Sequence, residues 1–162
     1  MNIFNDSSRV WIYQSNRELT AGETLELEQK LNQFTIEWTA HDNLLKAHSE
    51  VKYNRFIILM VDEAQHNASG CSIDKSVRLM KEIEQLFKIN LFDRFNIAFR
   101  SEHKVESVSR EEFEELLKNK TVGLETIVFN NLVSTKKEFE TKWEIALKDS
   151  WHNQVFASAL EL

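Results

Sequence analysis

Short extended apolar segments alternate along this chain with segments of helical periodicity, and this alternation restricts the possible folds more than any other feature. The clearest extended segment is FIILMV at residues 56–61, whose six consecutive apolar residues predict a buried strand. Further strand patterns occur at residues 9–13, 44–51, 95–99, 103–108 and 126–129. Several of these strands are neighbours in the sequence, as in hairpins. The pattern predicts an α+β fold, with a mixed or antiparallel sheet and about four helices packed on it, rather than a doubly wound parallel sheet.

Four segments have the pattern of amphipathic helices. Thr20, Ser109 and Thr135 are each followed three residues later by Glu, which is the spacing of a helix capping box. The remaining helix is expected at about residues 72–87, with Ser72 as one candidate for its N-cap. Apolar residues recur every three or four positions, and in the last helix they are Phe139, Trp143 and Leu147.

The composition favours one domain over several. The 162 residues include no proline, and no segment has the composition of a linker or of a low-complexity region. A chain of this length can bury enough surface to fold without a disulfide or a metal ion. We therefore expect residues 1–162 to form a single domain. Its apolar C-terminal segment, residues 151–162, should dock on the domain or form a homodimer.

Charge and hydropathy limit the possible partners and locations. The formal net charge is −6, and such a field repels nucleic acids and anionic lipids. The longest apolar run, residues 56–61, is too short to cross a bilayer of about 30 Å. The N-terminus lacks the basic segment and apolar run of a secretory signal. We expect a cytoplasmic protein that binds neither nucleic acid nor membrane.

Two segments look like parts of an ATPase. Residues 57–63, IILMVDE, look like the magnesium-binding strand, and Lys75-Ser76 precedes a helix as in a phosphate loop. That loop, G-x-x-x-x-G-K-[ST], requires glycines so that bare backbone amides can surround the phosphates. Aligned on Lys75, the glycine positions hold Ser69 and Asp74, and a carboxylate there would repel phosphate. The order of the two segments is also inverted. The sequence therefore predicts no ATPase activity.

Four segments carry a resemblance to known proteins: WTAH at residues 38–41, ASGCSIDKS at 68–76, VFNNLV at 128–133 and DSWH at 149–152. Together they resemble a family of small bacterial proteins of uncharacterised function, whose members are often labelled "ABC transporter ATPase". The similarity extends over about residues 9–156. One position departs from the family's pattern, because Asp42 stands where a glycine is expected after His41. The resemblance supplies the family's label, but it implies no mechanism, substrate or cofactor.

The loop before the second helix is the strongest candidate for a site. Unpaired amides at a helix N-terminus attract anions and lower the pKa of a nearby thiol, here that of Cys71. In the alternative interpretation, the polar residues only start the helix and Cys71 is a small buried hydrophobic residue. The candidate ligand-binding residues of this loop are Ser69, Gly70, Ser72, Asp74 and Lys75.

A thiol enzyme that uses Cys71 would also need a base. The predicted strand order could bring His41 or His66 close to the thiol. Because Cys71 is the only cysteine, it cannot form an intramolecular disulfide, and no cysteine-protease signature surrounds it.

Three further residues could take part in ligand binding. Asn130 and Asn131 follow a predicted strand and could orient a ligand, or they could form a turn. His152 could line a site, or it could be a packed surface residue beside Trp151. The sequence has no cysteine pair and no H-x-x-x-H spacing, so neither a metal nor another cofactor is predicted.

Three functions from different classes remain open. The first is an interaction or structural domain that uses its apolar C-terminal segment. The second is a binding module for a small anionic ligand at residues 69–76, and the third is a thiol-dependent enzyme using Cys71. We rank them in this order because the first requires no constellation that the sequence lacks.

Overall fold

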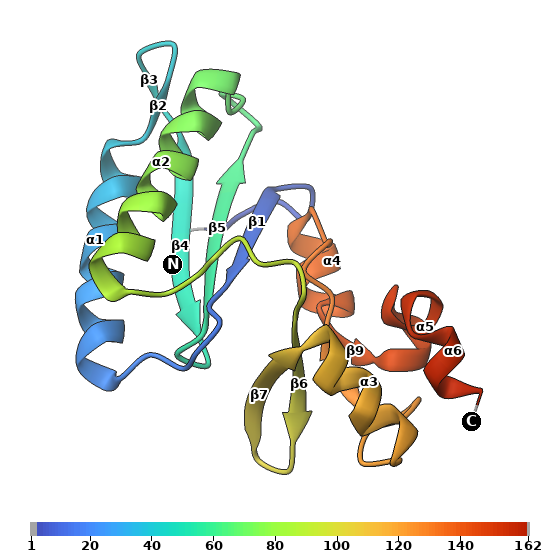
Figure 1. The fold of residues 1–162 in the computed structure, drawn as a ribbon. Coiled ribbons are helices and arrows are strands. Elements are labelled where there is room, and N and C mark those ends of the chain that lie inside the picture. The colour runs from blue at the N-terminus through green and yellow to red at the C-terminus, as the bar shows by residue number, and fades with distance from the viewer. Residues whose placement is uncertain (1–2, 162) are drawn as a thin grey trace.

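Two antiparallel sheets form the framework of the protein (Figure 1). The computed structural model describes residues 3–161 of the chain. The first sheet has the order β1-β5-β4, with the bounds Arg9–Gln14, Phe56–Asp62 and Lys46–Lys52. The second sheet has the order β7-β6-β8-β9, with the bounds Lys104–Ser109, Asn96–Ser101, Ile127–Phe129 and Glu144–Ala146. The predicted α+β class is confirmed, with the strands divided between these sheets and a small hairpin.

The helices cover the outer sides of the two sheets. In Figure 1, α1 and α2 lie side by side on one face of the first sheet, and α3, α5 and α6 lie at the opposite end of the molecule. The bounds are Ala21–Glu37 for α1, Gly70–Phe87 for α2, Arg110–Lys118 for α3, Lys136–Lys142 for α4, His152–Val155 for α5 and Ala157–Leu160 for α6. A short 3-10 helix, η1, covers Leu147–Asp149.

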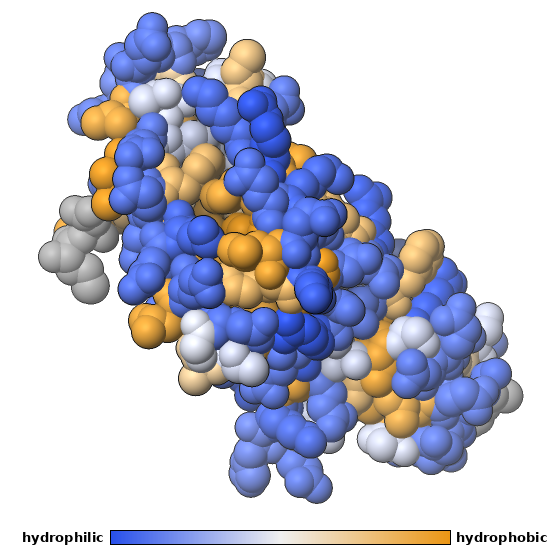
Figure 2. Space-filling view, turned by 60° about the vertical axis from the view of Figure 1, so that its left-hand side comes forward, coloured by the Kyte–Doolittle hydropathy of each residue, from blue (hydrophilic) through white to orange (hydrophobic). Residues whose placement is uncertain are grey.

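The surface is mostly hydrophilic, as Figure 2 shows for one face, with hydrophobic residues gathered near the middle of that face. Several large apolar side chains are nevertheless exposed, among them Phe95 at 62% and Leu132 at 74%. None of the helices within residues 3–161 has both the length and the apolar character needed to span a membrane.

The predicted helix caps are confirmed at three positions. The side chains of Thr20, Ser109 and Thr135 each accept a hydrogen bond from the backbone N–H of the glutamate three residues later. The second helix begins earlier than predicted, so the assignment of Ser72 as its N-cap is wrong. Ser69 is the N-cap. The Ser72 hydroxyl accepts a hydrogen bond from the Ser69 N–H at 2.7 Å, which is the role of a glutamate in most capping boxes.

The last predicted helix is shorter than its apolar pattern indicates. It ends at Lys142, so Trp143 and Leu147 do not continue its stripe. Residues 144–146 instead form β9, which pairs with β8 and supplies the hydrogen bonds that this edge of the second sheet needs. Pairing between distant segments here outweighs a local helical pattern.

The β2–β3 hairpin, formed by Thr39–Ala40 and Asn43–Leu44, explains why a glycine is expected in its turn. The two residues of the turn, His41 and Asp42, have φ angles of 51° and 66°. Two consecutive left-handed residues are typical of the tightest hairpin turns, which favour glycine at the second position. Aspartate is among the residues that tolerate this conformation.

β5 is buried along its whole length, as its sequence predicts. Successive side chains of a strand point to opposite faces of the sheet. Ile57 and Leu59 belong to the cluster that packs under α1 and α2. Phe56 and Ile58 belong to a second cluster, which includes Phe129 of the other sheet. The continuous apolar run is required because both faces of this strand are covered.

An aromatic cluster of Phe56, Phe129 and Trp143 joins the two sheets. The ring centroids lie 4.8 Å apart for Phe56 and Phe129, 4.9 Å for Phe56 and Trp143, and 5.0 Å for Phe129 and Trp143. One of the three contacts is tilted and two are edge-on, and the charge distribution of aromatic rings favours such geometry. All three side chains are at least 98% buried, so no water separates the sheets at this point.

A polar contact closes one side of the aromatic cluster. The Tyr53 hydroxyl donates to Glu144 Oε2 at 2.6 Å and accepts from Arg100 Nη2 at 2.8 Å. Tyr53 comes from the turn between β4 and β5, whereas Arg100 and Glu144 lie on β6 and β9. The contact therefore links the two sheets a second time.

The C-terminal segment packs on its own chain. Phe156 is buried and its ring lies 4.9 Å from the ring of Phe113 in α3, and Ala159 is buried in the same cluster. Leu162, the last residue of the predicted segment, lies outside the described residues. Phe156 and Ala159 therefore bury their apolar surface within one chain, whereas Val155 stays 44% exposed.

Replacing Phe56 tests the importance of the aromatic cluster. We expect Phe56→Ala to lower the free energy of unfolding by about 3–5 kcal/mol, because the lost ring leaves a cavity between the sheets. Phe95→Ala is the matched control, since that ring is 62% exposed, and its loss should stay within about 0.5 kcal/mol. Chemical denaturation gives both values, and a loss below about 1 kcal/mol at Phe56 would contradict this role of the cluster.

Helix capping gives a second test of the fold. We expect Ser109→Ala to lower the free energy of unfolding by about 0.5–2 kcal/mol, because the Glu112 N–H loses its acceptor. The control is Ser158→Ala, at an exposed position of helix α6, for which a change of at most about 0.5 kcal/mol is expected. Equal effects at the two serines would rule out a capping contribution.

Candidate functional site

The start of α2 uses most of its polar groups internally. Ser72 is buried, and its hydroxyl donates to the Ser69 carbonyl at 2.8 Å. The Ser69 hydroxyl in turn accepts from the Ser72 N–H at 3.1 Å. Gly70, Asp74 and Lys75 are exposed on the first turns of the helix. Anion binding at this helix start stays a prediction, and it has few polar groups left to support it.

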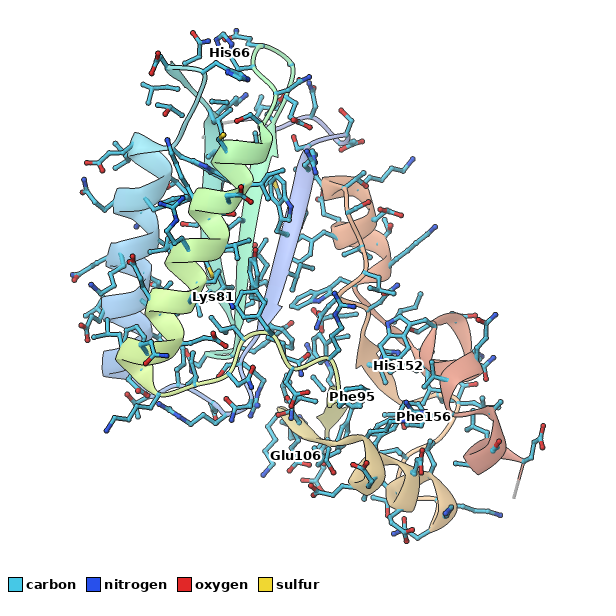
Figure 3. All side chains as sticks on the ribbon, turned by 45° about the horizontal axis from the view of Figure 1, so that its top comes forward. His66, Lys81, Phe95, Glu106, His152 and Phe156 are labelled. Carbon is cyan, nitrogen blue, oxygen red and sulfur yellow. The ribbon has the colours of Figure 1, made fainter. Side chains whose placement is uncertain are left out.

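Cys71 is exposed, so its alternative assignment as a buried hydrophobic residue is wrong. Its neighbour Ser72 occupies the buried side of the first turn, which turns Cys71 towards solvent. His41, His66 and Ser69 line a shallow hollow at this end of the molecule, where Figure 3 labels His66. Within residues 3–161, Cys71 makes no hydrogen bond to a histidine. A thiol enzyme stays a prediction without an identified base.

Asp62 and Glu63, the two acids of the ATPase-like segment, accept hydrogen bonds from backbone N–H groups of neighbouring loops. Asp62 accepts hydrogen bonds from the backbone N–H groups of Asn5 at 3.1 Å and Ala64 at 3.0 Å. Glu63 accepts the N–H of Ala68 at 2.7 Å. Burial opposes ionisation of Asp62, but these N–H groups and Lys46 outweigh it and lower the pKa of the carboxyl. Both carboxylates therefore have structural partners.

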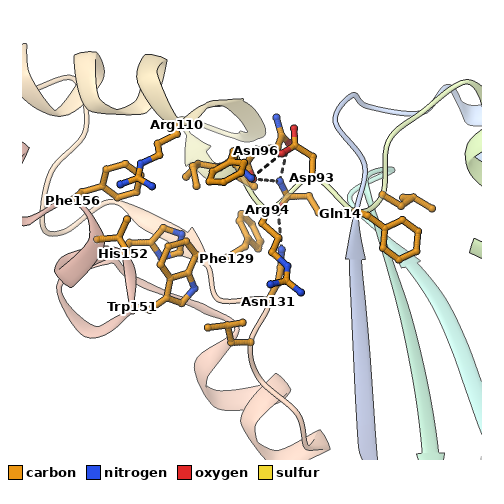
Figure 4. A pocket seen from close by; sticks show the side chains of 17 residues that line it. Gln14, Asp93, Arg94, Asn96, Arg110, Phe129, Asn131, Trp151, His152 and Phe156 are labelled. Atoms are coloured by element: carbon orange, nitrogen blue, oxygen red, sulfur yellow. Dashed lines mark hydrogen bonds between the residues drawn. The ribbon is translucent and has the colours of Figure 1, made fainter. Parts of the chain in front are cut away.

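A larger cavity of about 500 Å³ lies beside the aromatic cluster, between the first sheet and the C-terminal helices (Figure 4). Its lining comes from the end of β1, the connection before β6, the first half of β6, the start of α3, the end of β8 with the loop that follows it, and α5 with its flanking residues. Phe129 belongs both to this lining and to the aromatic cluster. The six lining residues most relevant to binding are Gln14, Arg94, Arg110, Asn131, Trp151 and His152.

A chain of side-chain amides crosses one wall of the cavity. Trp143 Nε1 donates to Asn131 Oδ1 at 2.9 Å, and Asn131 Nδ2 donates to Gln14 Oε1 at 2.9 Å. Gln14 Nε2 then donates to both the side-chain and the backbone oxygen of Asn96, at 2.9 and 2.8 Å. Figure 4 draws the contacts of Gln14 with Asn96 and Asn131. The chain fixes the orientation of each amide and joins β1 to the second sheet.

The two asparagines after β8 have different roles. Asn130 Oδ1 accepts the Leu132 N–H at 3.1 Å, so this residue forms the turn that the sequence offered as an alternative. Asn131 lines the cavity. The sequence pair therefore contains one turn residue and one candidate binding residue.

His152 forms a second wall together with Trp151. The two rings are stacked with centroids 3.7 Å apart, and His152 Nδ1 lies 2.8 Å from the Ser150 hydroxyl. His152 is 98% buried, so the alternative of a packed surface residue is wrong. Burial disfavours the charged imidazolium and lowers the pKa of His152 to about 4. The ring is therefore neutral in neutral solution.

Charged groups lie around the cavity. The Arg110 guanidinium lies 5.9 Å from the centre of the Phe156 ring, and its Nε is 3.6 Å from Glu114. Arg94 is exposed and makes no ion pair within residues 3–161. Asp93, the acid in the lining, uses Oδ1 to accept the Phe95 N–H at 2.9 Å. The lining thus contains two guanidinium groups and one carboxylate, and Arg110 has Glu114 outside the lining as its ion-pair partner.

The sequence identified only part of this cavity. Asn131 and His152 were candidates because of their residue types and their place after predicted elements. Gln14, Arg94 and Arg110 belong to no motif and are far apart in the chain. They come together through the packing of the two sheets, so no local pattern could have identified them.

Comparison of the chain with protein-family models, with curated proteins and with solved structures finds no match in any of the three. The family resemblance described above therefore stays a prediction.

The burial of His152 should make stability depend on pH. The folded chain binds the proton with a pKa of about 4, compared with 6.5 for an unperturbed histidine, so the unfolded chain takes up more protons between these values. We expect the free energy of unfolding to fall as the pH decreases from 6.5 to about 4, with a contribution from His152 of about 3 kcal/mol.

The comparison variant for this prediction is His152→Gln, which cannot take up the proton. Denaturation curves collected across the same pH range give the difference in stability between the two proteins. As the pH falls, we expect the original protein to lose more stability than His152→Gln. Parallel pH dependence of the two proteins would contradict the assignment.

Proposed function

We propose that the protein binds a small, mostly apolar molecule in the cavity between the first sheet and the C-terminal helices. The cavity volume of about 500 Å³ is within the range of ligand sites. The observation that carries the proposal is that polar side chains of the cavity are held in place by partners around it. Trp143 orients Asn131, and Ser150 contacts the His152 ring. A site fixed in this way loses little freedom when a ligand binds.

Exposed apolar side chains at the cavity support the same proposal. Phe95, Leu132 and Val155 all line it, and they are 62%, 74% and 44% exposed. They come from three separate segments of the chain, so their gathering around one cavity is a property of the fold. Covering such residues with an apolar ligand removes their surface from water, which favours binding.

Of the three functions that the sequence left open, the proposal retains the small-ligand binding module and places its site in the cavity. A small-ligand binding module was expected at residues 69–76, whereas the cavity has more polar groups free for a ligand. The interaction domain, the homodimer and the cytoplasmic location stay predictions. The homodimer has less support than before, because Phe156 and Ala159 pack on their own chain.

Binding of the neutral dye N-phenyl-1-naphthylamine tests the proposal. Its fluorescence rises in apolar surroundings, and we expect saturable binding with one site per chain. Phe95→Ser and Leu132→Ser should each weaken binding by about five-fold, since each removes an apolar contact of about 1 kcal/mol.

The matched control is Ile36→Ser, which changes an equally exposed apolar residue on α1 that does not line the cavity. Its dye affinity should equal that of the original protein. Absence of saturable binding, or equal losses in all three variants, would overturn the proposal.

A further inference from the structure

We propose that the ligand of the cavity carries one negatively charged carboxylate, which Arg94 and Arg110 bind. This inference rests on the proposed function and adds the chemical class of the ligand, an apolar or aromatic monocarboxylic acid. Four observations support it: the hydrogen-bonding groups left free in the cavity, the indole N–H of Trp151, the two arginines, and the net charge of the residues that line the cavity.

The groups that the amide chain leaves free are donors. Gln14 Oε1 and Asn131 Oδ1 already accept hydrogen bonds, as does Asn96 Oδ1. Each of Asn131 Nδ2 and Asn96 Nδ2 retains at least one N–H without a partner within residues 3–161. A ligand that meets these N–H groups must supply acceptors.

Trp151 adds another donor. Its Nε1 is buried and has no hydrogen-bond partner within residues 3–161, although the residue lines the cavity. A buried N–H without a partner destabilises the folded chain. An acceptor oxygen on a ligand would remove that destabilisation.

The two arginines supply the charge. Arg94 and Arg110 come from different segments, the connection before β6 and the first turn of α3, and both line the cavity. Figure 4 labels both arginines in the close view of the cavity, together with Trp151 and His152. A guanidinium group matches the planar geometry of a carboxylate. Arg94 makes no ion pair within residues 3–161, and Arg110 is paired through its Nε with Glu114 at 3.6 Å. Together the two guanidinium groups form a local positive site on a chain whose net charge is −6.

The local charge balance favours a single negative charge. The lining residues Arg94, Arg110 and Asp93 carry a net charge of +1, and Glu114 outside the lining is paired with Arg110. Arg94 is therefore the lining guanidinium without an ion pair within residues 3–161. His152 is neutral, since burial lowers its pKa to about 4. A carboxylate would neutralise this site, whereas a dianionic phosphate would leave an uncompensated charge beside apolar walls.

Competition between three naphthalene compounds tests the inference. 2-Naphthoate, 2-naphthamide and 2-naphthylmethylamine share one apolar body and differ in charge, and each can displace N-phenyl-1-naphthylamine. We expect 2-naphthoate to bind at least about ten-fold more tightly than the amide, because charged hydrogen bonds are the stronger ones, and the amine to bind most weakly.

Arginine variants identify the groups responsible. Arg94→Gln and Arg110→Gln should each weaken 2-naphthoate binding by about ten-fold and leave 2-naphthamide binding unchanged. Arg78→Gln is the matched control, because Arg78 is exposed on α2 and does not line the cavity. It should leave the affinity for all three compounds unchanged.

The outcomes separate this inference from the proposed function. Equal affinity for acid and amide, or equal losses in Arg78→Gln, would overturn the role of the arginines and leave binding in the cavity intact. A fourth competitor, 2-naphthyl phosphate, tests the charge of the ligand. If it binds more tightly than 2-naphthoate, the proposal of a singly charged ligand is overturned. Failure of the dye and of all three compounds to bind would overturn both proposals.

Discussion

Burial of β5 on both faces is the constraint on which the rest of the structure depends. One face packs under α1 and α2, and the other packs against the second sheet through Phe56 and Ile58. Complete burial of each such side chain contributes about 1.5–3 kcal/mol. A strand of this composition cannot be exposed on either side without losing that contribution. The helices and the second sheet are therefore both required, and their positions follow from this strand.

The cavity is a consequence of how the two sheets meet. Aromatic rings fill the contact around Phe56, and Phe129 is shared between that contact and the cavity wall. Gln14 pairs with Phe56 across the first sheet, so the end of β1 carries a polar side chain to the edge of the aromatic cluster. From there its amide reaches Asn96 of the second sheet. The same junction that stabilises the fold thus also orients the polar groups of the candidate site.

Predictions from the sequence succeeded where the deciding interactions are local. The caps at Thr20 and Ser109 depend on residues three positions apart, and both capping boxes are present. Predictions were wrong where distant residues decide. Trp143 continues a helical pattern, but pairing of the next three residues with β8 ends the helix before it. Cys71 is exposed because its neighbour Ser72 is on the buried side of the helix, where the distant Trp38 Nε1 donates to the Ser72 carbonyl at 2.8 Å.

By itself the sequence determined the α+β class, the buried strand at residues 56–61 and the starts of α1, α3 and α4, because periodicity and capping act over a few neighbouring residues. It also provided two cavity residues, Asn131 and His152. Only the tertiary structure brought Gln14, Arg94 and Arg110 to the same cavity. No spacing along the chain encodes that meeting, because it results from two sheets packing on a shared aromatic cluster, and packing depends on shape and burial in three dimensions.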